Sequence, residues 1–209
     1  MLAKVYRIET DRLVIRCYRP TDASLLKASV EESLEHLLPW MPWAKQEPEP
    51  LEKKVERLRK YRGEFDLGID HTFGIFNQEE NLLIGSTGLH TRLDETAREI
   101  GYWIHGQHLR KGFAVETVQA LLKVGFEIEQ LKRIEIRCSP DNLASQGVPK
   151  KLGFLHEGTL KNRTTGVNGQ PRDVMIWTLF REDYFQSDLM NFSLKAFDIC
   201  GNQIHHNER

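Results

Sequence analysis

The chain has 209 residues, of which 40% are hydrophobic and 28% charged, and its formal net charge is −1. That length suits one domain with a tail, and the composition excludes a disordered chain and a chain that spans a bilayer. The balanced charge removes any general electrostatic argument for nucleic-acid binding, so no direct nucleic-acid partner is expected.

The N-terminal part of the chain alternates between strand and helix patterns. Residues 1–16 lack the apolar region and cleavage site of a signal peptide, so a cytoplasmic location is expected. Residues 12–18 alternate as a strand does, and residues 22–37 follow with a helical pattern. Residues 38–50 contain four prolines and are expected to form a loop. Residues 51–65 repeat apolar residues at helical steps, with six basic residues that we interpret as a solvated face rather than a site for an acidic partner.

The second part of the chain has the pattern of a βαβ unit. Three strands in antiparallel succession, then a helix, a strand, a helix and a late strand are expected at residues 71–76, 82–90, 99–104, 114–130, 133–138, 142–154 and 173–180. This order predicts an α+β fold with a mixed sheet in a single domain, residues 1–184. The tail, residues 185–209, has no firm assignment, although its apolar side chains are enough to dock on this subunit or on another.

Cysteines and histidines are spaced without a metal or disulfide pattern. Cys17, Cys138 and Cys200 are an odd number at wide intervals, and we interpret them as buried small hydrophobes. No pair of histidines has the spacing of a helix-borne zinc motif, and His205 and His206 lie in a polar C-terminal end. We therefore expect neither a disulfide framework nor a metal site.

The turn from Arg110 to Ala114 joins a predicted strand to the N-terminus of a predicted helix. The first helical N–H groups have no intrahelical acceptor, and the helix dipole adds positive potential there, so an anion fits. Gly112 lets backbone approach a ligand, while Arg110 and Lys111 add the positive charge that suits a pyrophosphate. Neither of the two standard phosphate motifs, G-x-x-x-x-G-K-S/T and G-x-G-x-x-G, occurs in the chain, which indicates a different phosphorylated ligand.

Two segments, "REIGYWI" and "HLRKGFAVETVQALLKVGFEIEQLKRIEIRCSPDNLASQGVPKKLGFLHEGTL", closely resemble the central and C-terminal motifs of the GNAT acetyltransferases. The chain looks most like the RimJ/RimL branch, whose members acetylate protein N-termini and whose relatives acetylate small amines; "RLVIRCYRPTDA" and "LPWMPWA" also have counterparts there. The resemblance covers residues 12–184 and is dense over 98–158. It implies the GNAT fold, a mostly antiparallel mixed sheet flanked by helices, in which a central parallel pair of strands, 99–104 and 133–138, splays apart.

The same resemblance implies a set of residues that bind acetyl-CoA. The turn matches the family's pyrophosphate loop, and Asn142 and Ser145 match the branch's N-x-x-S, near the pantetheine arm and the sulfur. The exposed edge of strand 99–104 is expected to pair with pantetheine amides as an added strand would. The cofactor-binding residues are therefore expected to be Trp103, Ile104, Arg110, Lys111, Gly112, Phe113, Ala114, Val115, Asn142 and Ser145.

Three departures from the family pattern stand out. Leu109 occupies a position where Gln or Arg is usual, so one phosphate contact is expected to be absent or supplied by Arg110. Pro149 lies inside the second helix, which is expected to be short or bent. The tyrosine that many GNAT enzymes place near "KLGF" to protonate the thiolate is missing.

Catalytic roles are assigned to two side chains, each with a structural alternative. An amine is mostly protonated at neutral pH, and Glu99 is the candidate base; the alternative is a surface carboxylate paired with Arg98. Ser145 is a candidate to relay a proton to the departing thiolate, and the alternative is helix capping. For Asn142 the two alternatives are a contact with the pantetheine arm and a helix cap.

Aromatic side chains are candidates for the wall of an acceptor groove. Trp40 and Trp43 suit that role, although a packed loop is the alternative for both. Tyr102 and Trp103 alternate on one strand; Tyr102 is assigned to the groove, and one of the two is expected in the core.

The resulting prediction is an N-acetyltransferase that transfers the acetyl group from acetyl-CoA to a primary amine by direct attack in a ternary complex, without a metal. The favoured acceptor is a protein N-terminal α-amine, including that of a ribosomal protein. The alternatives are a small amine, such as a polyamine, amino sugar or amino acid derivative, and a non-catalytic acyl-CoA-binding regulatory module. The apolar tail and the self-association of many relatives favour a homodimer.

Overall fold

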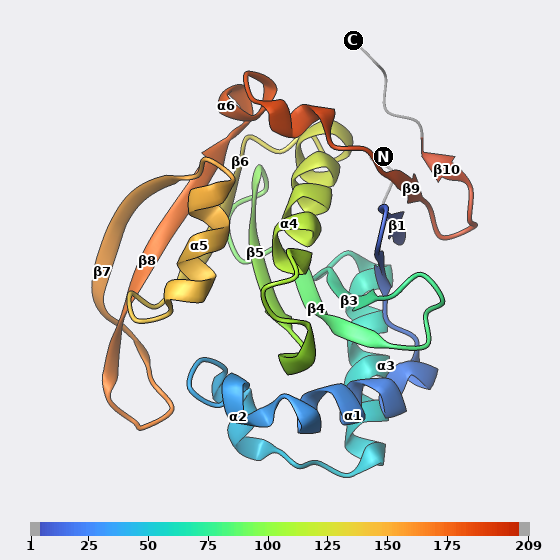
Figure 1. Cartoon of the computed structure of the whole chain (residues 1–209). Coiled ribbons are helices and arrows are strands. Elements are labelled where there is room, and N and C mark those ends of the chain that lie inside the picture. Colours follow the sequence, from blue (N-terminus) through green and yellow to red (C-terminus); the bar gives the residue numbers. More distant parts are fainter. Residues whose placement is uncertain (1–4, 205–209) are drawn as a thin grey trace.

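A ten-stranded sheet with the order β10-β9-β1-β2-β3-β4-β5-β6-β8-β7 organises the computed structural model, which describes residues 5–204 (Figure 1). The strands are β1 (Arg7–Glu9), β2 (Val14–Cys17), β3 (Thr72–Phe76), β4 (Leu83–His90), β5 (Ala97–Ile104), β6 (Arg133–Cys138), β7 (Leu155–Thr165), β8 (Pro171–Phe180), β9 (Lys195–Phe197) and β10 (Gln203–Ile204). The helices are α1 (Ala23–Glu32), α2 (Leu34–Leu37), α3 (Leu51–Leu67), α4 (Phe113–Lys123), α5 (Leu143–Lys151) and α6 (Arg181–Phe185). The predicted α+β fold with a mixed sheet is confirmed.

The parallel pair lies between β5 and β6, while the other pairings in the described sheet are antiparallel. Only three residues of each strand pair: 97–99 of β5 with 133–135 of β6. Beyond Glu99 the two strands part, as the family resemblance implied. The long crossover α4 joins them, because parallel neighbours need a connection that returns the chain to the same end of the sheet.

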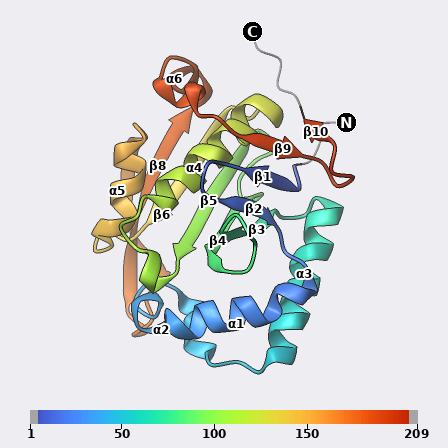
Figure 2. The same cartoon turned by 45° about the vertical axis from the view of Figure 1, so that its right-hand side comes forward.

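Alternation along β2 shows how the sheet buries both faces. Ile15 belongs to a core cluster that includes Val118 and Leu122 of α4, whereas Val14 belongs to a second cluster with Leu26 of α1 and Leu58 of α3. Successive strand residues point to opposite faces, so α4 and the pair α1/α3 cover opposite sides of the sheet (Figure 2).

The helix expected over residues 22–37 is interrupted in the structure. It is divided into a 3₁₀ turn, α1 and α2, with the break at Ser33. The Ser33 hydroxyl accepts the N–H of Gly106 at 3.0 Å, so the break ties this segment to the end of β5. Periodicity alone missed it because the apolar spacing continues across the break.

The tail, residues 185–209, to which the sequence analysis assigned no firm secondary structure, has defined structure over residues 185–204. Strand β9 pairs with β1 and with β10, which extends the sheet beyond the N-terminal strand (Figure 1). Leu189, Phe192 and Leu194 pack against the main core cluster of the same subunit. His205 and His206 lie outside the described residues.

Strand β7 is another element that the sequence analysis missed. Most of its side chains are exposed, and it lacks apolar alternation. Its order comes from pairing with β8 along the edge of the sheet, with irregularities between His156 and Gly158 and between Leu160 and Thr164. Over residues 5–204, no helix is long and apolar enough to cross a membrane.

Candidate active site

A cavity of about 690 Å³ opens where β5 and β6 part. Its lining comes from parts of the chain that are distant in sequence: the segment after β2, α1, the loop before α3, α3 itself, the start of β3 with the residues before it, strands β4 to β6, the start of α5 and the β7–β8 hairpin. Because β5 carries an unpaired edge beyond Glu99, the cavity contains backbone donors and acceptors as well as side chains. The geometry therefore offers a groove in which an extended ligand can pair with a strand edge.

The N-terminus of α4 has the backbone geometry of an anion site. Gly112 caps the helix with φ of 83°, and Arg110 has φ of 59°, so two left-handed residues bend the turn around the first helical N–H groups. Such a concave run of N–H groups binds anions, and an 11-residue helix adds its dipole. A Cβ at Gly112 would meet only the Arg12 guanidinium, at 3.4 Å, so backbone conformation is the main requirement for glycine there. The turn fits the pyrophosphate of acetyl-CoA.

Arg12 and Glu116 hold this turn, and the sequence analysis gave neither of them a role. Arg12 donates from Nε to Glu116 at 2.7 Å and from Nη1 to the carbonyl of Lys111 at 3.0 Å. Its guanidinium also lies 4.6 Å from the centre of the Phe113 ring. Glu116 is buried and accepts the Thr10 hydroxyl at 2.6 Å. Glu116 is in the first helical turn, where a carboxylate is stabilised by the dipole, and that position is the only local indication of its role.

Along the open edge of β5, only every second residue points its backbone N–H and carbonyl groups away from β4. His105 donates its N–H to Ile84 of β4, so the backbone groups of Trp103 also face β4. Tyr102 and Ile104 then turn their backbone groups to the open edge, and the Ile104 carbonyl already accepts a hydrogen bond from His36 at 2.9 Å. Of the two residues that the resemblance assigned to this edge, the geometry suits Ile104 better than Trp103, and Tyr102 joins it.

Asn142 and Ser145 meet Tyr102 at the start of α5. Asn142 is the N-cap, accepting the Ser145 N–H at 3.0 Å, so the capping alternative weighed for Ser145 is wrong. The Tyr102 hydroxyl donates to the Ser145 carbonyl at 3.1 Å and lies 3.3 Å from the Ser145 hydroxyl. Burial raises the pKa of Tyr102, although the hydrogen bond with Ser145 opposes this. Tyr102 therefore stays a neutral donor on the α5 side of the sheet, away from the two tryptophans with which it was grouped.

Cys138 ends β6 beside this cluster and is buried, as expected. Burial raises the pKa of its thiol, so the sulfur stays protonated and unreactive. Cys17 is also buried, but Cys200 is exposed, which contradicts the expectation that all three are core residues. Within residues 5–204, no group of three or more side chains has the arrangement of a metal site.

Glu99 lies in the cavity wall on the face of β5 that also carries Gly101 and Trp103, as alternation predicted. One of its oxygens lies 3.1 Å from Arg92 and the other 3.5 Å from Arg137. The structural alternative for Glu99 was an ion pair with Arg98, but its ion-pair partners are Arg92 and Arg137. The catalytic role of Glu99 stays a prediction.

Trp40 and Trp43 both line the cavity. The rings of Trp43 and Trp103 have centroids 6.3 Å apart, and both pack against the core cluster beneath α1 and α3. Arg172 of β8 lies 5.5 Å from the Trp40 ring and donates to the carbonyl of Pro39 at 3.0 Å. The loop before α3 is thereby joined to the β7–β8 hairpin across one end of the cavity.

Buried ion pairs with side chains of α3 also fix the loop before that helix. Lys54 of α3 is fully buried and pairs with Glu47, and it lies 3.1 Å from Glu49. Arg57 pairs with Glu49 at 2.7 Å. The interpretation of the α3 basic residues as a solvated face is therefore wrong for Lys54 and incomplete for Arg57, because two glutamates from the preceding loop fold back onto the helix.

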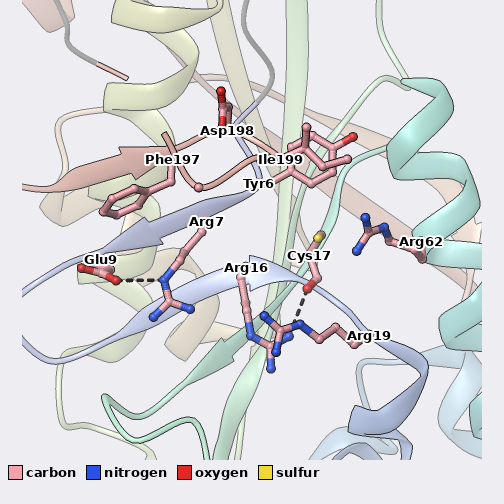
Figure 3. A pocket seen from close by; sticks show the side chains of 11 residues that line it. Tyr6, Arg7, Glu9, Arg16, Cys17, Arg19, Arg62, Phe197, Asp198 and Ile199 are labelled. Atoms are coloured by element: carbon pink, nitrogen blue, oxygen red, sulfur yellow. Dashed lines mark hydrogen bonds and ion pairs between the residues drawn. The ribbon is translucent and has the colours of Figure 1, made fainter. Parts of the chain in front are cut away.

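A second cavity, of about 340 Å³, lies towards the β10 edge of the sheet, between β1, β2, α3 and the turn after β9 (Figure 3). Four arginines line it, Arg7, Arg16, Arg19 and Arg62, and three of them are paired with nearby carboxylates. Arg7 pairs with Glu9 at 2.8 Å, and buried Arg16 pairs with Asp22 at 2.8 Å. Arg62 pairs with Asp66 at 2.8 Å. Three of the four arginine charges in this cavity are therefore neutralised by neighbouring carboxylates.

The family comparison agrees with this geometry. Residues 12–155 match the model of the acetyltransferase (GNAT) domain, and the chain belongs to that family. The match begins at Arg12, which holds the anion-binding turn, and includes β5, α4, β6 and α5. The protein is an acetyl-CoA-dependent N-acetyltransferase.

Relatives of the RimJ/RimL type are found in sequence and in structure. The Bacillus subtilis protein named "Uncharacterized N-acetyltransferase YoaA" is 29% identical over 177 residues, covering 83% of this chain and 96% of that protein. The Escherichia coli ribosomal protein uS5-alanine N-acetyltransferase is 27% identical over 183 residues, covering 85% and 92%. The structure of Mycobacterium smegmatis RimJ in complex with CoA-disulfide has the same fold, with a TM-score of 0.76, 24% identity and coverage of 88% and 90%.

Proposed function

We propose that the acceptor is the α-amine of a protein or peptide N-terminus, acetylated by direct attack on acetyl-CoA in a ternary complex. The observation that carries this proposal is the character of the groove. Its lining contains five arginines and three acidic residues, namely Arg57, Arg92, Arg137, Arg163, Arg172, Asp70, Glu99 and Asp173. A polyamine needs a predominantly acidic groove. A groove that is lined by aromatic side chains, and in which arginines outnumber acidic residues, instead suits a peptide.

The relatives support the same class of acceptor. The name of the Escherichia coli relative specifies N-acetylation of an alanine of ribosomal protein uS5, and the two chains cover most of each other. We infer that this chain acts on protein N-termini in the same general way. A ribosomal protein is the first candidate for the acceptor.

The proposed binding of acetyl-CoA uses the turn at Arg110–Val115 for the pyrophosphate and the open edge of β5 for the pantetheine arm. Ser145 and Tyr102 are proposed to supply the proton that the thiolate takes up, and their hydroxyl contact at 3.3 Å supports this role. Asn142 keeps its Nδ2 without a partner among residues 5–204, so capping and a pantetheine contact are compatible.

The test measures thiol release from acetyl-CoA, with mass spectrometry of the acceptor, across N-terminal peptides and a panel of polyamines, amino sugars and amino acids. Peptides that gain one acetyl group at the α-amine would support the proposal. Acetylation of small amines alone would refute the proposed acceptor. Binding of acetyl-CoA without transfer to any amine would favour a regulatory module.

A further inference from the structure

A histidine–aspartate pair lines the groove and has no part in the roles described so far. His90 ends β4 and is 9% exposed, and Asp70 directly precedes His71 and β3. Nδ1 of His90 lies 2.8 Å from Oδ2 of Asp70, and the other oxygen of Asp70 accepts the Thr91 N–H at 3.1 Å. Burial raises the pKa of the Asp70 carboxyl, but its hydrogen bonds outweigh burial and hold the pKa below its ordinary value.

The ionised Asp70 decides which nitrogen of the imidazole carries the proton. A carboxylate only accepts hydrogen bonds, so a neutral His90 beside it must keep its proton on Nδ1. Nε2 is then the free acceptor. This is the arrangement in which a carboxylate orients an imidazole that takes a proton from a reacting group.

Two glycines make room for the ring. Gly88 and Gly101 are direct partners across β4 and β5. A Cβ at Gly88 would lie 2.3 Å from Nε2 of His90, and a Cβ at Gly101 would lie 3.4 Å from the same atom. The imidazole therefore lies over Gly88, and its Nε2 lies beside Gly101, which has no side chain of its own to cover that nitrogen.

The position of Nε2 is the point where the parallel strands part. Gly101 follows Glu99, the last residue of β5 that pairs with β6. In the described part of the chain, His90 is the one histidine that lines this cavity, and its Nε2 has no hydrogen-bond partner there. Glu99, in contrast, has both carboxylate oxygens close to arginines.

We propose that His90 is the general base of acetyl transfer and that Asp70 is its positioning residue. Nε2 takes a proton from the acceptor ammonium, and the nitrogen lone pair attacks the thioester carbonyl carbon, forming the C–N bond. The C–S bond breaks with its electron pair on sulfur. The Tyr102–Ser145 hydroxyl pair gives the sulfur a proton and regains one from the amine nitrogen, so coenzyme A leaves as the free thiol. The imidazolium returns its proton to water in the groove. The proposal rests on the acetyltransferase activity and holds for any amine acceptor.

Other charged and titratable groups of the groove belong to the segment after β2, to α3, the segment after β4, β5, β6 and the β7–β8 hairpin: Tyr18, Arg57, Tyr61, Arg92, Glu99, Tyr102, Arg137, Cys138, Arg163, Arg172 and Asp173. Glu99 is the direct cross-strand partner of His90, and its charge is balanced by its two arginines. Arg57 is paired with Glu49. Asp70 is therefore the carboxylate in direct contact with the imidazole, and the pH dependence is assigned to this pair.

The kinetic test compares His90→Gln, Asp70→Asn and Glu99→Gln with the wild-type enzyme, with His156→Gln as a matched control outside the groove. His90→Gln is expected to lower kcat about a hundredfold or more at about pH 7, with KM for acetyl-CoA unchanged. The loss should shrink as the pH rises beyond about 8, where an α-amine deprotonates without help. Added imidazole should restore part of the rate. Asp70→Asn should show a smaller loss with the same pH trend.

Two results would overturn the proposal. One is a His90→Gln enzyme with the wild-type rate and pH profile. The other is a pH-dependent loss that appears in Glu99→Gln and not in His90→Gln.

A second measurement uses the wild-type protein and needs neither a variant nor an acceptor. Long-range ¹⁵N–¹H NMR spectra of the imidazoles report the tautomer of neutral His90. The proposal requires a protonated Nδ1 and a bare Nε2, and the opposite tautomer would refute it. If no amine is acetylated, the proposed acceptor fails, and the tautomer still tests His90 independently.

Discussion

Replacing Glu116 with glutamine should loosen the anion-binding turn while leaving the shape of the side chain unchanged. Glu116 accepts charge-assisted hydrogen bonds from Arg12 at 2.7 Å and a hydroxyl hydrogen bond from Thr10 at 2.6 Å. The amide retains one acceptor oxygen but presents an N–H group to a donor, so at least one of these bonds is lost. Hydrogen bonds to charged groups contribute about 1.5–3 kcal/mol each.

The side chain of Arg12 is 48% exposed, so solvent screening reduces this contribution towards the lower end of the range. We expect the free energy of unfolding to fall by about 2 kcal/mol, which corresponds to a decrease in Tm of about 4–8 °C for a chain of this size. Arg12 also donates to the Lys111 carbonyl. In the Glu116→Gln variant Arg12 is held less firmly, so the free turn is less ordered and must be ordered when it binds an anion. An ordering cost of about 1 kcal/mol would weaken coenzyme A binding about fivefold.

Urea unfolding and calorimetric titration with coenzyme A measure the two effects separately. Glu52→Gln is the matched control, because Glu52 is also in the first turn of a helix but is exposed. It should change stability by less than about 0.5 kcal/mol. Lower stability with unchanged coenzyme A affinity would show that Arg12 does not preorganise the turn. Unchanged stability would contradict the buried pairing itself.

Two further predictions concern Lys54, which fixes the loop before α3, and Asp70, which lines the groove. Lys54→Ala should lower the free energy of unfolding by about 3 kcal/mol, because buried Glu47 loses its closer cation and keeps only Arg57 at 3.7 Å; an unchanged urea midpoint would contradict this. The lowered pKa of Asp70 means that its contribution to stability is present above the ordinary value of 3.8 and is lost as the pH falls below it. Asp70→Asn should therefore lose stability less steeply than the wild type between about pH 5 and 3, and parallel acid unfolding curves would refute this assignment.

Local patterns were enough to predict most of the sheet. Strands β3, β4 and β5 were expected in antiparallel succession, and alternation placed Glu99 on the same face as Gly101 and Trp103. Side-chain alternation is a property of an extended backbone, and the buried face of each strand records it in the sequence. Strand β7 was not predicted because its side chains are mostly exposed, so its sequence lacks the alternation of apolar and polar residues that marks a strand with one buried face.

The anion-binding turn was also predicted from its own residues. A glycine with positive φ at a helix start is a short-range feature, and Gly112 has that conformation. The helix N-terminus supplies unpaired N–H groups whatever the rest of the chain does. The sequence could therefore indicate a phosphate site before any tertiary contact was known.

The sequence by itself determined strands β2 to β6 and β8, the helix that follows the phosphate turn and the family to which the chain was assigned, because these depend on neighbouring residues. Only the tertiary structure decided which distant side chains meet. Arg12 and Glu116 are 104 positions apart, and Asp70 and His90 are 20 apart. Their pairing depends on sheet order and register, which bring separate strands and helix ends together, and no local pattern encodes those relations.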